Sequence, residues 1–133
     1  MIVFDIGGHE SRERDKEFQA RLEAVLGGPV AYQHMGKWDV GSPQAADELR
    51  DSVVSLMRPL DRAADRGESV CYIMPGLSAS VAAFLALIHG QMGHFPRMIW
   101  LVKDESGQYR QPVLLDLDDM REWAREHLRF PDR

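Results

Sequence analysis

Short apolar runs alternate with longer stretches of helical periodicity along this chain of 133 residues. The apolar runs predict strands over residues 1–6, 30–33, 70–74 and 98–102. Apolar residues at helical spacing predict helices over 12–26, from Pro43 to just before Arg66, and over 78–88. A polar hairpin tip over 103–110, a strand over 111–116 and a helix over 117–128 follow. This order predicts a single α/β domain over residues 1–133, with a mainly parallel sheet, helices on both faces and an antiparallel edge hairpin.

Capping residues set the expected helix boundaries. We expect Ser11 to cap the first helix and Ser42 to cap the second, with Pro43 at its first position. Pro59 should bend the second helix or end its regular part. The helix over 78–88 is apolar almost all round, so we expect a second copy to cover part of it. Apolar residues lie on one side of the last helix: Met120, Trp123, Ala124 and Leu128.

The segment 69–96 contains the most informative turn. Pro75 should end the preceding strand, because proline cannot donate a hydrogen bond to a neighbouring strand. Gly76 permits a sharp turn and a close approach by a ligand, and Ser78 is placed to cap the next helix, with Leu77 before it. The free N–H groups of that first helical turn favour an anion such as a phosphate.

A second candidate loop, Gly7-Gly8-His9, follows the first strand. Its glycines allow main-chain N–H groups to face a phosphate, and His9 can donate a hydrogen bond or move a proton. Both loops, and the loop after Gln33, follow parallel strands, so we expect them at one edge of the sheet. The spacing fits neither a dinucleotide-binding nor a P-loop fingerprint.

Composition and charge narrow the class of protein. The chain is 44% hydrophobic with a net charge of −5, which argues against disorder and against binding duplex DNA. The apolar runs are too short to span a membrane, and the lone Cys71 falls in a buried strand, so we expect a cytoplasmic protein. No histidine pair has helical metal-site spacing, and we expect neither a metal nor a cofactor. We expect His89 and His94 to have structural roles, with His94 bonded to the backbone and with Gly90 and Gly93 capping the helix.

Two motifs carry a resemblance: Pro75-Gly76-Leu77-Ser78 and the run from His89 to Pro96. They resemble small accessory proteins of type III CRISPR systems, which are related to the Rossmann-like CARF sensor domain. The resemblance is densest over residues 70–100. It implies a CARF-like homodimer that binds cyclic oligoadenylate, with cyclic tetra-adenylate as the expected ring, and so lowers this second messenger. Assembly beyond the dimer on ligand is left open.

The resemblance assigns roles to particular residues. Main-chain donors would come from Gly7, Gly8, Gly76, Leu77 and Ser78, beside Pro75, while Gln33, Lys37 or Trp38 would reach a base and His9 a phosphate or ribose. The chain would act by sequestration and slow cleavage, or, as an alternative, mainly as a metal-independent ring nuclease acting through the ribose 2′-OH. His9 and Ser11 would then be the candidate catalytic residues. A small nucleotide- or flavin-binding Rossmann-like domain is a further alternative.

Overall fold

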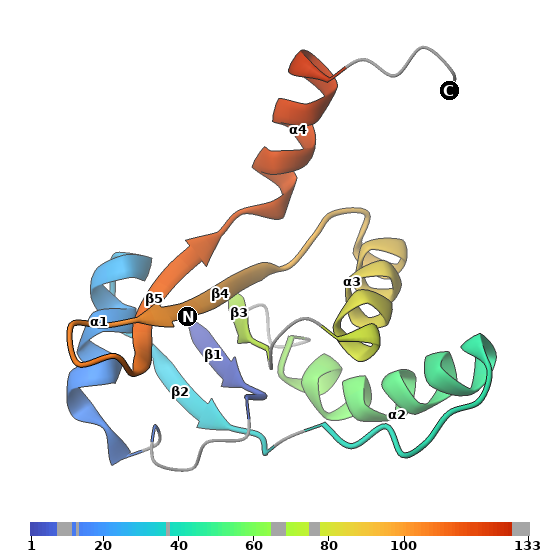
Figure 1. The fold of residues 1–133 in the computed structure, drawn as a ribbon, viewed down its shortest axis with the longest axis horizontal. Helices are drawn as coiled ribbons and strands as arrows, with labels where there is room; N and C mark the ends of the chain where they lie inside the picture. Colours follow the sequence, from blue (N-terminus) through green and yellow to red (C-terminus); the bar gives the residue numbers. More distant parts are fainter. Residues whose placement is uncertain (8–11, 13, 37, 65–68, 75–77, 129–133) are drawn as a thin grey trace.

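A five-stranded sheet forms the centre of the computed structural model, which describes the chain except residues 8–11, 13, 37, 65–68, 75–77 and 129–133 (Figure 1). The strands are β1 (Ile2–Asp5), β2 (Ala31–His34), β3 (Val70–Ile73), β4 (Arg97–Lys103) and β5 (Tyr109–Leu115). Their spatial order is β2-β1-β3-β4-β5; the first four are parallel and β4–β5 is antiparallel. The predicted Rossmann-like α/β topology with an edge hairpin is confirmed.

Helices cover both faces of this sheet (Figure 1). They are α1 (Lys16–Leu26), α2 (Ala46–Ala64), α3 (Ala79–Met92) and α4 (Leu117–His127). Phe18 and Leu22 of α1 pack against one face, in a cluster with Val3 and Cys71. On the other face, side chains of α2 and α3 pack against alternate residues of β1 and against β3; they include Val53, Met57, Leu60, Phe84 and Ile88. Apolar residues on both sides of β1 and β3 explain their nearly unbroken apolar sequence.

Two helices begin later than predicted. Asp15, and not Ser11, caps α1 by accepting a 3.0 Å hydrogen bond from the N–H of Phe18; Ser11 itself lies outside the described residues. Helix α2 begins at Ala46 instead of Pro43. Its first turn contains Asp47 and Glu48, whose carboxylates favour the positive end of a helix. Pro59 does not end α2, which continues to Ala64.

The ends of α3 separate a correct prediction from an incorrect one. Ser78 caps its N-terminus, as predicted, and Gly93 caps its C-terminus with a φ of 79°. Gly90, by contrast, lies inside the helix, which extends to Met92. The buried side of α3 carries Val81, Phe84 and Ile88, while Ala82 and Ala86 are exposed. The face available to a second copy therefore carries small side chains in the middle of the helix, with the larger Gln91 and Met92 exposed at its end.

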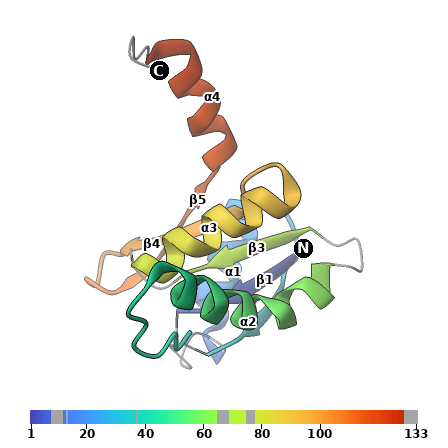
Figure 2. The ribbon, with the colours of Figure 1, turned by 90° about the vertical axis from the view of Figure 1, so that its right-hand side faces the viewer.

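Helix α4 extends away from the sheet (Figures 1 and 2). None of its residues is buried, and three large residues of the apolar side noted in the sequence are exposed: Met120, Trp123 and Leu128. Its first turn is anchored: Asp118 accepts a 3.0 Å hydrogen bond from the N–H of Phe95, just before β4. Across the described residues, no helix has the length and apolar character needed to cross a membrane.

Candidate functional site

The chain leaves β1 and β3 at the same edge of the sheet. These strands are parallel neighbours, and the N–H of Ile6 donates a 2.8 Å hydrogen bond to the carbonyl of Ile73. Gly7 and Met74 follow directly, so the two candidate loops start side by side. This confirms that the two loops leave the sheet at one edge. Seven residues predicted for the site lie outside the described residues: Gly8, His9, Ser11, Lys37, Pro75, Gly76 and Leu77.

Ser78 shapes the start of α3 at this edge. Its backbone is extended, and its side-chain oxygen accepts a 3.4 Å hydrogen bond from the N–H of Val81. Its hydroxyl also shares a 2.7 Å hydrogen bond with that of Ser80. The first turn of α3 contains no acidic residue. The positive end of the α3 dipole is therefore not neutralised by a carboxylate of that turn.

A hollow of about 500 Å³ lies between the N-termini of α2 and α3. Its lining is mainly apolar, with a few polar groups: Val40, Pro43, Gln44, Ala45, Ala46, Leu49, Ser78, Ala79 and Ser80. Pockets of this size and character suit small organic ligands that present one apolar ring and a few polar atoms. Ser78 lies both in this hollow and at the α3 N-terminus, so an apolar group in the hollow and an anion at the helix end would lie next to each other.

The other described residues predicted for ligand contact lie on elements beside this edge. Trp38 is half-buried, and its ring meets that of Phe84 edge-on with centroids 5.2 Å apart. Part of this indole is thus used for packing against α3. Gln33 is exposed on β2, opposite Phe4 of β1. Their ligand contacts stay predictions.

Gly7 has an internal role that the sequence reading did not assign. Its N–H donates a 2.8 Å hydrogen bond to Oδ1 of Asp5. A Cβ at Gly7 would lie 2.2 Å from Nη2 of Arg12, so the missing side chain makes room for the guanidinium. One expected main-chain donor is therefore already engaged within the protein.

Asp5 is the centre of a buried polar cluster. Its carboxylate, with no exposed surface, accepts hydrogen bonds from Arg12 at 2.7 and 2.9 Å and from the hydroxyl of Tyr32. Tyr32 lies on β2 opposite Val3, on the face that α1 covers. On that face His34 pairs with Asp5, and its Nδ1 is buried with no hydrogen-bond partner among the described residues.

Burial and this carboxylate together set the protonation of the cluster. Burial raises the pKa of Tyr32 well above its usual value, and the hydrogen bond to Asp5 raises it further. Burial alone would lower the pKa of Arg12, but its hydrogen bonds and ion pair with Asp5 outweigh this, and the pKa is raised. Tyr32 is thus a neutral donor and Arg12 a fixed cation. Because Arg12 is paired with Asp5, its charge is largely neutralised within the protein and is poorly available to a ligand.

The sequence did contain a signal for this cluster. Asp5 is the only charged residue in the run from Met1 to Ile6, and it stands where a buried strand ends. A charge in such a position requires a partner. That Arg12 and Tyr32 supply the partners could not be read from spacing, because they reach Asp5 from a later loop and from a neighbouring strand.

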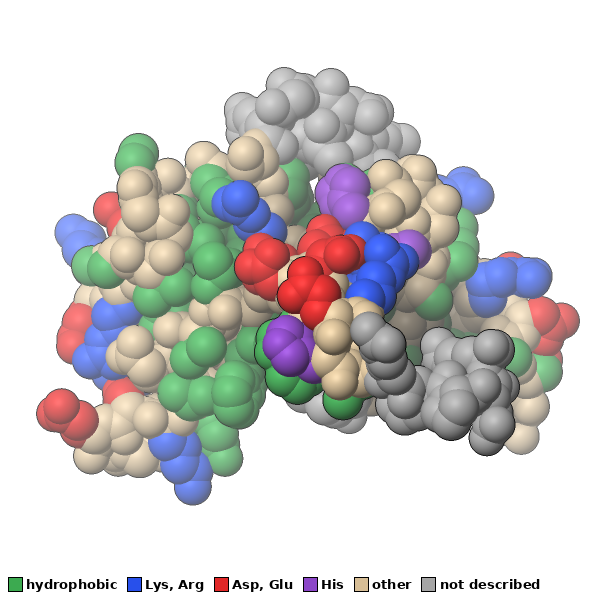
Figure 3. Space-filling view, turned by 90° about the horizontal axis from the view of Figure 1, so that it is seen from above, with side chains coloured by type: hydrophobic (Ala, Val, Ile, Leu, Met, Phe, Trp, Pro, Cys, Tyr) green, Lys and Arg blue, Asp and Glu red, His purple; other side chains and the backbone are tan. Residues whose placement is uncertain are grey.

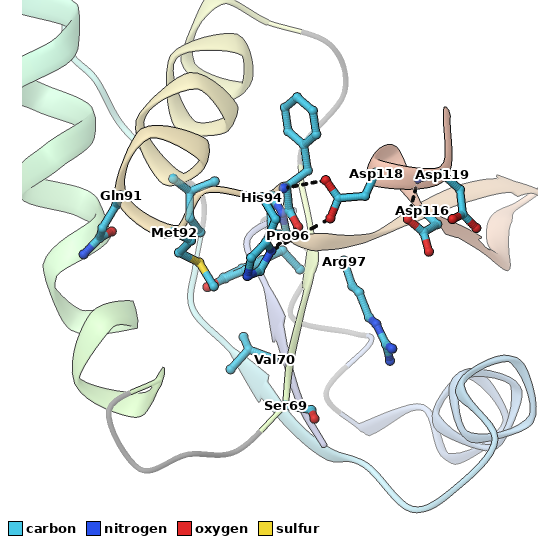
Figure 4. A pocket seen from close by; sticks show the side chains of 13 residues that line it. Ser69, Val70, Gln91, Met92, His94, Pro96, Arg97, Asp116, Asp118 and Asp119 are labelled. Carbon is cyan, nitrogen blue, oxygen red and sulfur yellow. Dashed lines mark hydrogen bonds and ion pairs between the residues drawn. The ribbon is translucent and has the colours of Figure 1, made fainter. Parts of the chain in front are cut away.

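A second hollow, of about 600 Å³, lies at the opposite edge of the sheet, where β3 and β4 begin (Figure 4). Met92, His94 and Asp118 lie across it from Ser69 and Val70 (Figure 4). As predicted, His94 bonds to the main chain: its Nδ1 lies 3.0 Å from the carbonyl oxygen of Phe95. Three aspartates of the α4 N-terminus line this hollow: Asp116, Asp118 and Asp119. Their charges disfavour a phosphate there, despite its larger volume.

Comparisons with family models, with curated proteins and with solved structures give no match. The fold defines the chain as a Rossmann-like α/β protein with four helices and a mostly parallel sheet. Within the described segments, no three His, Cys, Asp or Glu side chains gather as a metal site.

Proposed function

We propose that this protein binds cyclic oligoadenylate, with cyclic tetra-adenylate as the ring, and lowers the free second messenger of a type III CRISPR system. The observation that carries the proposal is the hollow between the N-termini of α2 and α3, which includes Ser78. The resemblance of the segment around Ser78 to CRISPR accessory proteins supplies the identity of the ligand.

The two helix N-termini suit different parts of an adenylate unit. The first turn of α3 has no acidic residue, so it favours a phosphate. The first turn of α2 contains Asp47 and Glu48, which repel a phosphate. The apolar lining contributed by Val40 and Leu49 suits an adenine ring. We therefore place the phosphate at Ser78 and the base toward α2.

A ring of repeated units is matched by symmetry. Two copies related by a two-fold axis would present two α3 N-termini to one cyclic tetra-adenylate. The exposed Ala82 and Ala86 allow a second copy to approach α3 closely. The homodimer implied by the resemblance, formed through α3 around the bound ring, is part of this proposal.

Sequestration is favoured over cleavage by the state of Arg12. Cleavage through a ribose 2′-OH requires groups that stabilise charge on the reacting phosphate. Arg12 is already paired with Asp5, so its guanidinium is poorly available for this role. Metal-independent cleavage, with His9 and Ser11 as candidate catalytic residues, is retained as the slower activity.

The direct test is calorimetry with cyclic tetra-adenylate and two matched variants. Ser78→Asp keeps a good N-cap but places a carboxylate where the phosphate would bind, so affinity should fall about 10-fold or more. Ser55→Asp makes the same change on an exposed position of α2 and should bind like the native protein. Failure of the native protein to bind at micromolar concentrations, or equal binding by Ser78→Asp, contradicts the proposal.

Cleavage is measured separately by incubating the ring with excess protein in EDTA and separating the products. An intact ring supports sequestration. Slow formation of linear product with a 2′,3′-cyclic phosphate end fits sequestration with slow cleavage. Rapid and complete conversion to that product would make ring cleavage the main activity.

A further inference from the structure

Helix α4 carries large apolar side chains that are about half exposed in the described part of the chain. Met120, Trp123 and Leu128 are 53%, 55% and 46% exposed. Their spacing places them along one side of the helix and its C-cap. Uncovered apolar side chains that lie together on a helix mark an interaction surface more often than isolated ones do.

The direction of α4 is fixed by its first two turns. Asp118 accepts the hydrogen bond from the N–H of Phe95, and Nη1 of Arg121 lies 2.8 Å from Nε2 of His89 at the end of α3. The guanidinium of Arg121 also lies over the ring of Phe95, 5.8 Å from its centroid. Helix α4 is thus held as an arm that points away from its own sheet (Figures 1 and 2).

Part of a sheet surface on the same chain is open around Trp100, although Met98 on the same face is buried. Trp100 of β4 is 56% exposed and pairs with Val113 of β5, on the same side of the sheet as Leu115. This is the face that α2 and α3 cover over β1 and β3, but those helices do not extend over the hairpin. Seen from above, hydrophobic side chains gather on the hairpin side of the molecule, beside the charged side chains around α4 (Figure 3).

We propose that two copies of this chain exchange their α4 arms, so that Met120 and Trp123 of each copy pack on Trp100, Val113 and Leu115 of the other. One surface is a helical ridge and the other a sheet face, so the two are complementary and both belong to every copy. A reciprocal exchange closes under a two-fold axis and leaves neither surface open.

The length of α4 and the exposed apolar area are compatible with packing of α4 from a second copy on the hairpin. The 11 residues of α4 span about 16 Å, and the seven residues of β5 span about 23 Å. Trp100, Met120, Trp123 and Leu128 are each about half exposed, so with about 200 Å² for a large side chain they offer roughly 400 Å² of apolar area per copy. A standard stable interface buries about 800 Å² per partner, including its polar rim. The charged residues of α4 pair among themselves, as Arg125 does with Glu122, and supply that rim.

This interface is separate from the candidate ligand site. Strand β5 ends opposite Met98, near the start of β4, so α4 begins at the sheet edge opposite Ser78. Arm exchange leaves the hollow at α2 and α3 open. The inference therefore does not depend on the proposed ligand, and each can fail alone.

Sedimentation equilibrium without nucleotide tests the exchange. The native chain should be a dimer at micromolar concentrations. Trp123→Glu should weaken the dimer roughly 30-fold or more, as expected for a central tryptophan of an interface. Trp123 has no buried neighbours on α4, so this variant should keep its fold by circular dichroism. Met35→Glu is the matched control and should stay dimeric. Met35 is apolar and 36% exposed, and it follows β2, on the far side of the sheet from the β4–β5 hairpin.

Cross-linking identifies the occupant. In a Cys71→Ala background, Val113→Cys and Ala124→Cys proteins are mixed and treated with a short bismaleimide. A product with one chain of each kind supports exchange. A monomeric native chain, a dimer indifferent to Trp123→Glu, or a cross-link formed only within one chain by the double variant overturns it. Trp123→Glu should still bind cyclic tetra-adenylate if the proposed function is right, which separates the two failures.

Discussion

Arg12 donates two hydrogen bonds to the carboxylate of Asp5 at the end of β1, from Nε at 2.7 Å and from Nη2 at 2.9 Å. The pair fixes the segment before α1 to the central sheet. Both side chains are almost fully enclosed, Asp5 with no exposed surface and Arg12 with 8%. The start of the first candidate loop is therefore held rigidly at the carboxyl edge.

Replacing Asp5 with Asn should strongly destabilise the protein. The change leaves a buried guanidinium without its counter-charge, which costs about 3–5 kcal/mol. Urea denaturation measures the loss. Glu17→Gln, which removes exposed ion pairs with Arg21 and Arg110, is the control and should cost only about 0.5–1 kcal/mol. Equal effects of the two variants would show that the buried pair has no special weight.

Gly7→Ala should destabilise by about 1–3 kcal/mol, because the new methyl group would displace Arg12. Gly28→Ala is the matched control, since a Cβ there meets nothing within 4 Å. The control should be neutral or slightly stabilising. Unfolding midpoints in urea compare the two. A tolerated Gly7→Ala would mean that Arg12 can move aside at little cost.

Stability should fall as the pH rises above about 9. Burial raises the pKa of the Cys71 thiol to about 11. The folded state therefore holds this proton more tightly than the unfolded state, in which the thiol ionises near pH 9. The stabilisation is complete below pH 9 and is lost as the pH approaches 11, by about 2 kcal/mol. Tyr32, whose pKa burial also raises, adds a loss of the same sign at higher pH.

Denaturation at pH 8 and pH 10.5 measures this loss, with Cys71→Ala as the comparison. The variant should lose less stability across the interval than the native chain. Identical losses would assign the alkaline sensitivity to other groups.

The two glycines near the end of α3 should respond oppositely to alanine. Gly90 is exposed within the helix and a Cβ there meets nothing, so Gly90→Ala should stabilise by about 0.5–1 kcal/mol. Gly93 has a φ of 79°, so Gly93→Ala should destabilise by about 1–2 kcal/mol. Thermal melts of both variants test the assignment. If both variants shift the melting temperature in the same direction, the position of the C-cap is wrong.

The sequence alone determined the class of fold and most of the element order. Apolar runs such as Val70–Ile73 and the periodicity of α3 are local signals, and the propensities at Ser78 and Gly93 act over a few residues. Helix starts were less secure. Ser42 and Pro43 match the residue preferences for a helix start, yet α2 begins at Ala46, with Asp47 and Glu48 in its first turn.

Only the tertiary structure decided which distant residues meet. It joined Asp5 to Arg12 and Tyr32, placed the hollow between the starts of α2 and α3, and left Trp100 and Trp123 more than half exposed on separate surfaces. The apolar side of α4 was visible in the sequence, but its exposure in the described structure was not. The spacing of apolar residues along one helix shows that a face is apolar, because this pattern is set by the local sequence alone. Whether that face is covered depends on where the rest of the chain lies in space.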